Sequence, residues 1–150
     1  MDRTHLELAV ELRRALHAHP ELSNHEEWTR AELMRFLRVH TDLAVIDREN
    51  WFYAVYRAPD PKRRVAFRAD FDALPIEDAC GAPYVSKIPG VGHKCGHDGH
   101  SAALAAFAME VDANGCENDV YFIFQHAEET GDGAKECAPL ITEEKIDEVF

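Results

Sequence analysis

The sequence predicts an α/β domain in which helices flank a mixed β-sheet. Three features of the chain favour this fold class. Two segments with helical hydrophobic periodicity come first, a group of short strand-like segments follows, and an Ala-rich helix then precedes a continuous apolar strand. Such alternation of helices and strands is typical of layered α/β domains. The 150 residues are enough for one domain with a core of its own.

Two helices are expected in the N-terminal part of the chain. Apolar residues recur at helical spacing between residues 3 and 17, and Pro20 ends this helix. Ser23 and Glu26 have the spacing of a capping box, in which each side chain binds the backbone at the start of a helix. The second helix is therefore predicted to begin there and to run to about His40.

The middle of the chain changes to strand-like segments. Residues 43–46, 51–56 and 64–68 are short and rich in β-forming residues. Residues 60–62, with the sequence Asp-Pro-Lys, predict a hairpin turn between the last two of these strands. Residues 77–99 are rich in glycine and proline, so we expect a loop there.

The alternation continues to the end of the chain. The Ala-rich segment 101–111 predicts a helix, and the apolar run 119–124 predicts a buried strand. A short helix is expected from about residue 132 to just before Pro139, and residues 146–150 look like the start of one more strand. Because the chain stops within that strand, we expect the polypeptide to be incomplete.

Composition excludes several classes of function. The formal net charge of −12 disfavours nucleic acid and anionic membrane surfaces as partners. No apolar run approaches the ~18 residues of a membrane helix, and no signal peptide opens the chain, so a cytoplasmic location is expected. The cysteines are widely spaced and are expected to be free or metal-ligating: Cys80, Cys95, Cys116 and Cys137.

The densest chemical signal is the stretch G-H-K-C-G-H-D-G-H at residues 92–100. Cys95 and His97 lie two apart, and a thiolate and an imidazole are good ligands for zinc and its late-transition neighbours. Gly96 lets the backbone turn so that both side chains can reach one ion, and Asp98 could orient a ligating histidine. The alternative is a polar surface loop with a chance cluster of histidines.

A second signal, Q-H-A-E-E-T-G, directly follows the apolar run 119–124. Adjacent carboxylates repel each other and resist desolvation, so Glu128 and Glu129 at the end of a buried strand call for a cation. One carboxylate could bind a metal while its neighbour acts as a general base. The alternative is an exposed helix start, where Glu is favoured in any case.

A third signal is R-A-D-F-D-A-L-P at residues 68–75. Asp70 and Asp72 leave the end of a predicted strand, and in extended chain two residues at this spacing point the same way. Carboxylates at strand ends commonly serve sites in α/β proteins. The alternative is a turn that is merely rich in Asp.

Taken together, these motifs resemble the metal-dependent aminoacylase and carboxypeptidase family. The match includes R-A-D-F-D-A-L-P-I-E, G-H-K-C-G-H-D-G-H-S and F-I-F-Q-H-A-E-E-T-G-D-G-A-K, in that order. The opening R-R-x-L-H-x-H-P-E-L-S-x-x-E-E-x-T of residues 13–29 fits as well. The branch resembled is the amidohydrolase branch of hippurate hydrolases, auxin-conjugate hydrolases and N-acetyl-diaminopimelate deacetylases.

The resemblance implies a zinc-exopeptidase-like catalytic domain that holds two divalent metal ions. Cys95, His97 and Glu129 would then be metal ligands, and Glu128 would be the general base. Asp70 stands where related branches have a metal-binding histidine, so Asp72 is expected to support the site rather than to bind metal. A Cys, His and Glu set suits zinc, cobalt or nickel, and manganese is favoured mainly by the carboxylates.

Two histidines stay without an assigned role. His100 belongs to the matched motif. His126 replaces the proline that the branch usually carries, and it could either add a ligand-like group or be a tolerated loop substitution. Lys94 stands where a small residue is common.

By the same resemblance, residues 1–150 would form the N-terminal part of a single catalytic domain. The lid or dimerisation domain and the C-terminal part, with further histidines of the site, would then be absent from this chain. We therefore expect a metal-dependent amidohydrolase that cleaves the amide bond of small N-acyl amino acids, with doubtful activity for these 150 residues alone. A homo-oligomer is possible in a full-length form. The alternative is a non-catalytic metal- or partner-binding fragment of the same scaffold.

Overall fold

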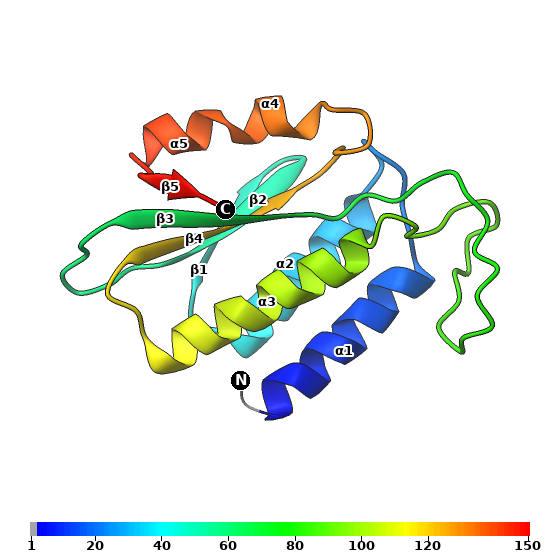
Figure 1. Cartoon of the computed structure of the whole chain (residues 1–150), viewed down its shortest axis with the longest axis horizontal. Helices are drawn as coiled ribbons and strands as arrows, with labels where there is room; N and C mark the ends of the chain where they lie inside the picture. The colour runs from blue at the N-terminus through cyan, green and yellow to red at the C-terminus, as the bar shows by residue number, and fades with distance from the viewer. Residues whose placement is uncertain (1–2) are drawn as a thin grey trace.

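One five-stranded sheet lies between two layers of helices in the computed structural model, which describes residues 3–150 (Figure 1). The predicted α/β class with a mixed sheet and flanking helices is confirmed. In chain order the elements are α1 (Arg3–Ala18), α2 (Glu27–His40), β1 (Ala44–Arg48), β2 (Trp51–Tyr56), β3 (Arg64–Asp70), α3 (His97–Asn114), β4 (Asp119–Gln125), α4 (Gly133–Cys137), α5 (Pro139–Glu143) and β5 (Glu148–Val149).

The strand order in the sheet is β1-β2-β4-β3-β5. β1 and β2 pair antiparallel, β2 and β4 pair antiparallel, and β3 is parallel to both of its neighbours. The predicted hairpin between residues 51–56 and 64–68 is therefore wrong, because β4 lies between these two strands. The hairpin joins β1 to β2 instead, and Glu49 in its turn has a φ of 72°.

The central strand β4 is buried along its whole length, and its side chains build two cores. Because successive side chains of a strand point to opposite faces, Phe122 and Phe124 pack under α1, α2 and α3. Tyr121 and Ile123 face the other way, toward Leu140 and the layer of α4 and α5. Covering β4 from both sides fixes its C-terminal end, where the site begins.

Helix α2 is capped differently from the prediction. Neither Ser23 nor Glu26 makes a side-chain cap at its start. Glu21 does so instead, because its carboxylate accepts hydrogen bonds from the backbone N–H groups of Trp28 and Thr29 at 3.2 and 2.7 Å. Ser23 and Glu26 are thereby free to contact the segments that follow β3 and β4.

Most predicted elements have close counterparts in the structure. The first helix ends one residue later than predicted, and the last strand is present as β5, parallel to β3. The largest shift in a boundary is at α3, which begins at His97 although a loop was predicted up to residue 99. Among the described residues, no helix is both long enough and apolar enough to cross a membrane.

Candidate metal centre

Three segments meet at one edge of the sheet. β3 and β4 run parallel with Asp70 opposite Gln125, so the residues that follow the two strands leave the sheet side by side. The N-terminal part of α3 lies against the same edge, where the Ser101 hydroxyl donates a 2.6 Å hydrogen bond to the carbonyl oxygen of Asp70. This topology gathers all three motifs of the sequence at one place.

His97 lies at the centre of these segments and is buried. Its Nδ1 is 3.0 Å from both the side-chain Oδ1 and the main-chain oxygen of Asp72. Its Nε2 faces carboxylate oxygens of Asp70 at 3.9 Å, Glu128 at 3.8 Å and Glu129 at 3.9 Å. One ring nitrogen is therefore held by Asp72, while the other points into a group of acidic side chains.

Cys95 completes a set of potential metal ligands. One ligand atom from each of Cys95, His97 and Glu129 lies within 4.8 Å of the others. Gly96, between Cys95 and His97, has a φ of 86°, a left-handed conformation that favours glycine and turns the chain into α3. The convergence predicted for these three side chains is observed.

Asp72 is the main organiser of the site. Its Oδ2 accepts hydrogen bonds from the Ser23 hydroxyl at 2.7 Å and from the Glu129 backbone N–H at 3.0 Å, while its Oδ1 faces His97. Burial alone would raise the pKa of Asp72, but the hydrogen bonds from His97, Glu129 and Ser23 lower it below its ordinary value. The carboxylate is thus negative and fixes both a histidine and an acidic ligand.

The charges of the site respond to one another. Burial opposes the imidazolium form of His97, but the bond to Asp72 and the charge of Asp70 raise its pKa above the ordinary value. Burial raises the pKa of Asp70, against the lowering effect of Arg68. The pKa of the Cys95 thiol is also raised, because its hydrogen bond and charge interaction with Glu129 disfavour the thiolate. These shifts favour the protonated forms of His97, Asp70 and Cys95, in contrast to the ionised Asp72.

A strained turn presents the two adjacent glutamates. Ala127 has a φ of 45°, and its backbone N–H donates a 2.8 Å hydrogen bond to the carboxylate of Glu26. A left-handed non-glycine residue costs about 1 kcal/mol or more, and it persists where the surroundings determine it. The turn leaves the Glu129 side chain 20% exposed and that of Glu128 41% exposed. Glu129 therefore faces the buried His97, and Glu128 stands nearer to solvent.

The side chains present fit divalent metal ions. A thiol, an imidazole and a carboxylate are the donors that zinc and its neighbours prefer. Four carboxylates lie around His97, namely those of Asp70, Asp72, Glu128 and Glu129. Within the described part of the chain, the buried Oε1 of Glu129 has no hydrogen-bond partner. A cation would satisfy this oxygen and offset the repulsion among the carboxylates.

The two histidines without an assigned role lie in different places. His100 is exposed and forms a second possible ligand group with Asp70 and His97. His126 is 1% exposed, and its Nε2 lies 3.2 Å from a carboxylate oxygen of Glu136 in α4. His126 therefore contacts α4 and is not part of the group formed by Cys95, His97 and Glu129.

Two residues of the site were missed by the sequence reasoning. Ser23 and Glu26 were interpreted as a helix cap, but in the structure they hold Asp72 and Ala127. Asp70 belonged to the third motif of the sequence but was given no role, and in the structure its carboxylate lies 3.9 Å from Nε2 of His97. The opening motif that contains Ser23 and Glu26 belongs to the family pattern, and this was the available signal for their role.

The comparisons with known proteins agree with this geometry. Residues 66–150 match the sequence profile of peptidase family M20/M25/M40. The chain belongs to this family. The profile begins within β3 and includes every proposed ligand, and the resemblance to the amidohydrolase branch is confirmed by the relatives.

Relatives of this M20 chain include bacterial proteins named as hydrolases. YhaA of Bacillus subtilis, an amidohydrolase by name, is 43% identical over 94% of the chain. An uncharacterised hydrolase of Staphylococcus saprophyticus is 42% identical over 87% of it. The chain covers only 37% and 35% of these two proteins.

A solved structure supports the same family. The Bacillus subtilis protein YxeP, described as a dinuclear metal-binding peptidase of the M20 family, superposes on 99% of the chain with a TM-score of 0.92 and 32% identity. The superposition covers 43% of YxeP. The family and its fold are therefore established for the M20 chain.

Proposed function

We propose that this M20 chain belongs to a metal-dependent amidohydrolase that cleaves the amide bond of N-acyl amino acids or similar small peptide-like substrates. The observation that carries the proposal is the convergence of Cys95, His97 and Glu129, with Glu128 beside them. The names of the relatives support amide-bond hydrolysis, and the dinuclear metal binding described for YxeP supports a centre of two metal ions.

In this proposal Cys95, His97 and Glu129 are metal ligands for two divalent ions, with zinc, manganese, nickel or cobalt as candidates. Asp72 is a positioning residue, because it holds both His97 and the backbone of Glu129. When bound, the ions supply Lewis-acid polarisation of the scissile carbonyl and activation of the attacking water.

Glu128 is the proposed general base. Its Oε2 lies 3.8 Å from Nε2 of His97, so it borders the ligands, and its 41% exposure lets it reach a water molecule and a substrate. Glu128 accepts the proton of the attacking water at its carboxylate and passes it to the leaving amine. Its neighbour Glu129 cannot share this role if its carboxylate is occupied as a ligand.

The proposal also covers the domain to which the chain belongs, its cellular location and its partners. Residues 1–150 would form the N-terminal part of one catalytic domain, with the lid and dimerisation region and further ligands supplied outside them. The location would be the cytoplasm, and the partner a small-molecule substrate, with a homo-oligomer formed in the full-length protein. The chain covers 37% of YhaA, which is consistent with a larger protein that contains these 150 residues as one part.

The test is an assay of the full-length protein that contains this chain. Release of free amino acids from N-acyl substrates is measured before and after chelation, together with metal content. We expect Glu128→Gln to keep its metal and to lose about 10²–10⁴-fold in turnover, because an amide cannot accept the proton. Glu117→Gln, at a residue 77% exposed and away from the site, is the matched control.

Two results would overturn the proposal. One is amino-acid release that is indifferent to both chelation and Glu128→Gln. The other is full metal loading with no release from any N-acyl substrate, which would favour the non-catalytic binding fragment.

A further inference from the structure

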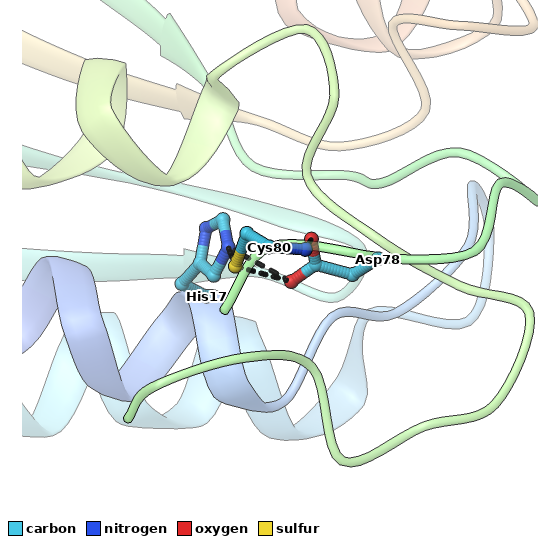
Figure 2. Close-up of side chains that lie close together, drawn as sticks. All are labelled: His17, Asp78 and Cys80. Carbon is cyan, nitrogen blue, oxygen red and sulfur yellow. Dashed lines mark hydrogen bonds and ion pairs between the residues drawn. The ribbon is translucent and has the colours of Figure 1, made fainter. Parts of the chain in front are cut away.

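A second cluster of metal-binding side chains lies outside the centre described above. It joins His17, near the end of α1, to Asp78 and Cys80 in the long loop between β3 and α3 (Figure 2). The Asp78 Oδ2 is 3.1 Å from the His17 Nε2 and 3.3 Å from the Cys80 Sγ, and the last two atoms are 4.0 Å apart. Three ligand-type atoms therefore face one another across segments about 60 residues apart in sequence.

These distances are close to those between the donors of a tetrahedral zinc ion. With Zn–N near 2.0–2.1 Å and Zn–S near 2.3 Å, tetrahedral donors lie about 3.3–3.6 Å apart. Of the three observed separations, 3.1 Å lies just below that range, 3.3 Å at its lower end and 4.0 Å above it. Small side-chain movements, most of all of Cys80, would therefore bring the three atoms into a common coordination shell.

The histidine of the cluster is oriented in the manner of a metal ligand. His17 Nδ1 is 2.8 Å from the Asp98 Oδ2, so Nε2 is the nitrogen directed at Asp78 and Cys80. A carboxylate on the far nitrogen is the usual partner of a ligating histidine. The same arrangement occurs in the first centre, where Asp72 holds Nδ1 of His97.

The carboxylate of Asp78 has one oxygen directed at the cluster. Its Oδ1 is paired with Lys94 and accepts the Cys80 backbone N–H, while the Ser86 backbone N–H donates to Oδ2 at 3.0 Å. These contacts, Lys94 first, hold the pKa of Asp78 well below its usual range. The oxygen facing His17 therefore belongs to a fixed, negative carboxylate with a further lone pair for a cation.

An independent observation at this cluster is the buried side chain of His93. It is 6% exposed, and within the part of the chain that the structure describes neither of its ring nitrogens has a hydrogen-bond partner. Its ring centroid lies 6.3 Å from that of His17. A buried imidazole without partners beside His17 needs an explanation, and a cation bound at His17, with its coordinated water, would give one.

We propose that His17, Asp78 and Cys80 bind a zinc-type divalent cation, separate from the catalytic ions. The role of this cation is structural. It ties the long loop to α1, and through Asp98 it is linked to the first turn of α3, which carries His97.

The test uses Co²⁺ as a probe, because a cobalt–thiolate bond gives a near-ultraviolet charge-transfer absorption. The 150-residue chain carrying Cys95→Ala and His97→Ala removes the thiolate of the first centre. We expect this background to keep a cobalt–thiolate absorption that disappears when Cys80→Ala is added. Cys116→Ala, at a partly exposed cysteine outside the cluster, should leave the absorption unchanged.

A second measurement does not depend on variants. Cys80 is exposed, so alkylation followed by mass spectrometry reports its reactivity directly. We expect Zn²⁺ to slow alkylation of Cys80 by about tenfold or more, since a metal-bound thiolate is withdrawn from attack, with little change at Cys116. Equal alkylation rates with and without Zn²⁺, or a cobalt–thiolate absorption indifferent to Cys80→Ala, would overturn the proposal.

Discussion

Asp72 holds His97 through two oxygen atoms at once. The Nδ1 of His97 lies 3.0 Å from the side-chain Oδ1 of Asp72 and 3.0 Å from its main-chain oxygen. The other carboxylate oxygen of Asp72 accepts the Glu129 backbone N–H. A single side chain thus sets the orientation of two proposed ligands, one on each side of the site.

We expect Asp72→Asn to weaken metal binding by about 10–100-fold, because an outer partner that orients a ligating histidine is lost. Zinc affinity of the 150-residue chain, measured by competition with a chelating dye, checks this. Asp60→Asn, in the exposed turn between β2 and β3, is the control and should bind as the unmodified chain does. Equal affinities for all three proteins would contradict the positioning role of Asp72.

Glu26 gives a prediction about pH. Burial raises the pKa of Glu26, although the Ala127 backbone N–H lowers it in part. The folded chain therefore holds this proton to higher pH than the unfolded chain, whose Glu pKa is about 4.3. Stability attributable to Glu26 is then greatest below the unfolded pKa and falls as pH rises toward the folded pKa.

Glu26→Gln keeps an oxygen that can accept the Ala127 N–H but cannot ionise. We expect this variant to have a higher Tm than the unmodified chain at neutral pH, and the difference to vanish below a pH of about 4. Thermal unfolding at a series of pH values measures it. Glu27→Gln, at the exposed neighbouring position, is the control, and a Glu26→Gln difference that does not change with pH would refute the explanation.

The sequence predicted the elements better than their connections. Periodicity located α1 and α2, because the apolar stripe of each faces the core between the sheet and these helices. The hairpin at residues 60–62 was mispredicted because nothing local reveals that β4 inserts between β2 and β3. Pairing of distant strands depends on burial of β4 from both faces, which is a property of the whole sheet.

For the candidate site, the sequence predicted the proposed ligands but not the long-range contacts that hold them. The donor types in their motifs marked Cys95 and His97 as possible ligands, and the family resemblance added Glu129 as the third. The structure brings the three side chains together. The roles of Ser23 and Glu26 could not be read from local spacing. A capping box and a pair of long-range hydrogen bonds use the same residue types, and only the fold decides between them.

The capping of α2 gives a prediction that separates these two interpretations. We expect Glu21→Ala to cost about 1 kcal/mol of stability, because the backbone N–H groups of Trp28 and Thr29 lose their acceptor. Hydrogen exchange at these two amides should accelerate. Ser23→Ala should leave their exchange unchanged, because Ser23 donates to Asp72 and not to the helix. If exchange at these amides were faster in Ser23→Ala and unchanged in Glu21→Ala, the capping box would be the correct interpretation.

Gly133 allows α4 to approach the turn that carries the glutamates. A Cβ at this position would lie 1.7 Å from the backbone oxygen of His126 and 2.8 Å from its carbonyl carbon. Because both atoms belong to the backbone, no side-chain rotation can relieve the clash, and the turn through Ala127 must move.

We therefore expect Gly133→Ala to destabilise the chain by about 1–3 kcal/mol or more, and to weaken zinc binding because the displaced turn carries Glu129. Urea unfolding and zinc competition on the same preparations measure the two effects. Gly81→Ala is the matched control, since a Cβ there meets nothing within 4 Å. If Gly133→Ala and Gly81→Ala had the same unfolding free energy and zinc affinity, the close approach of α4 would not position the turn.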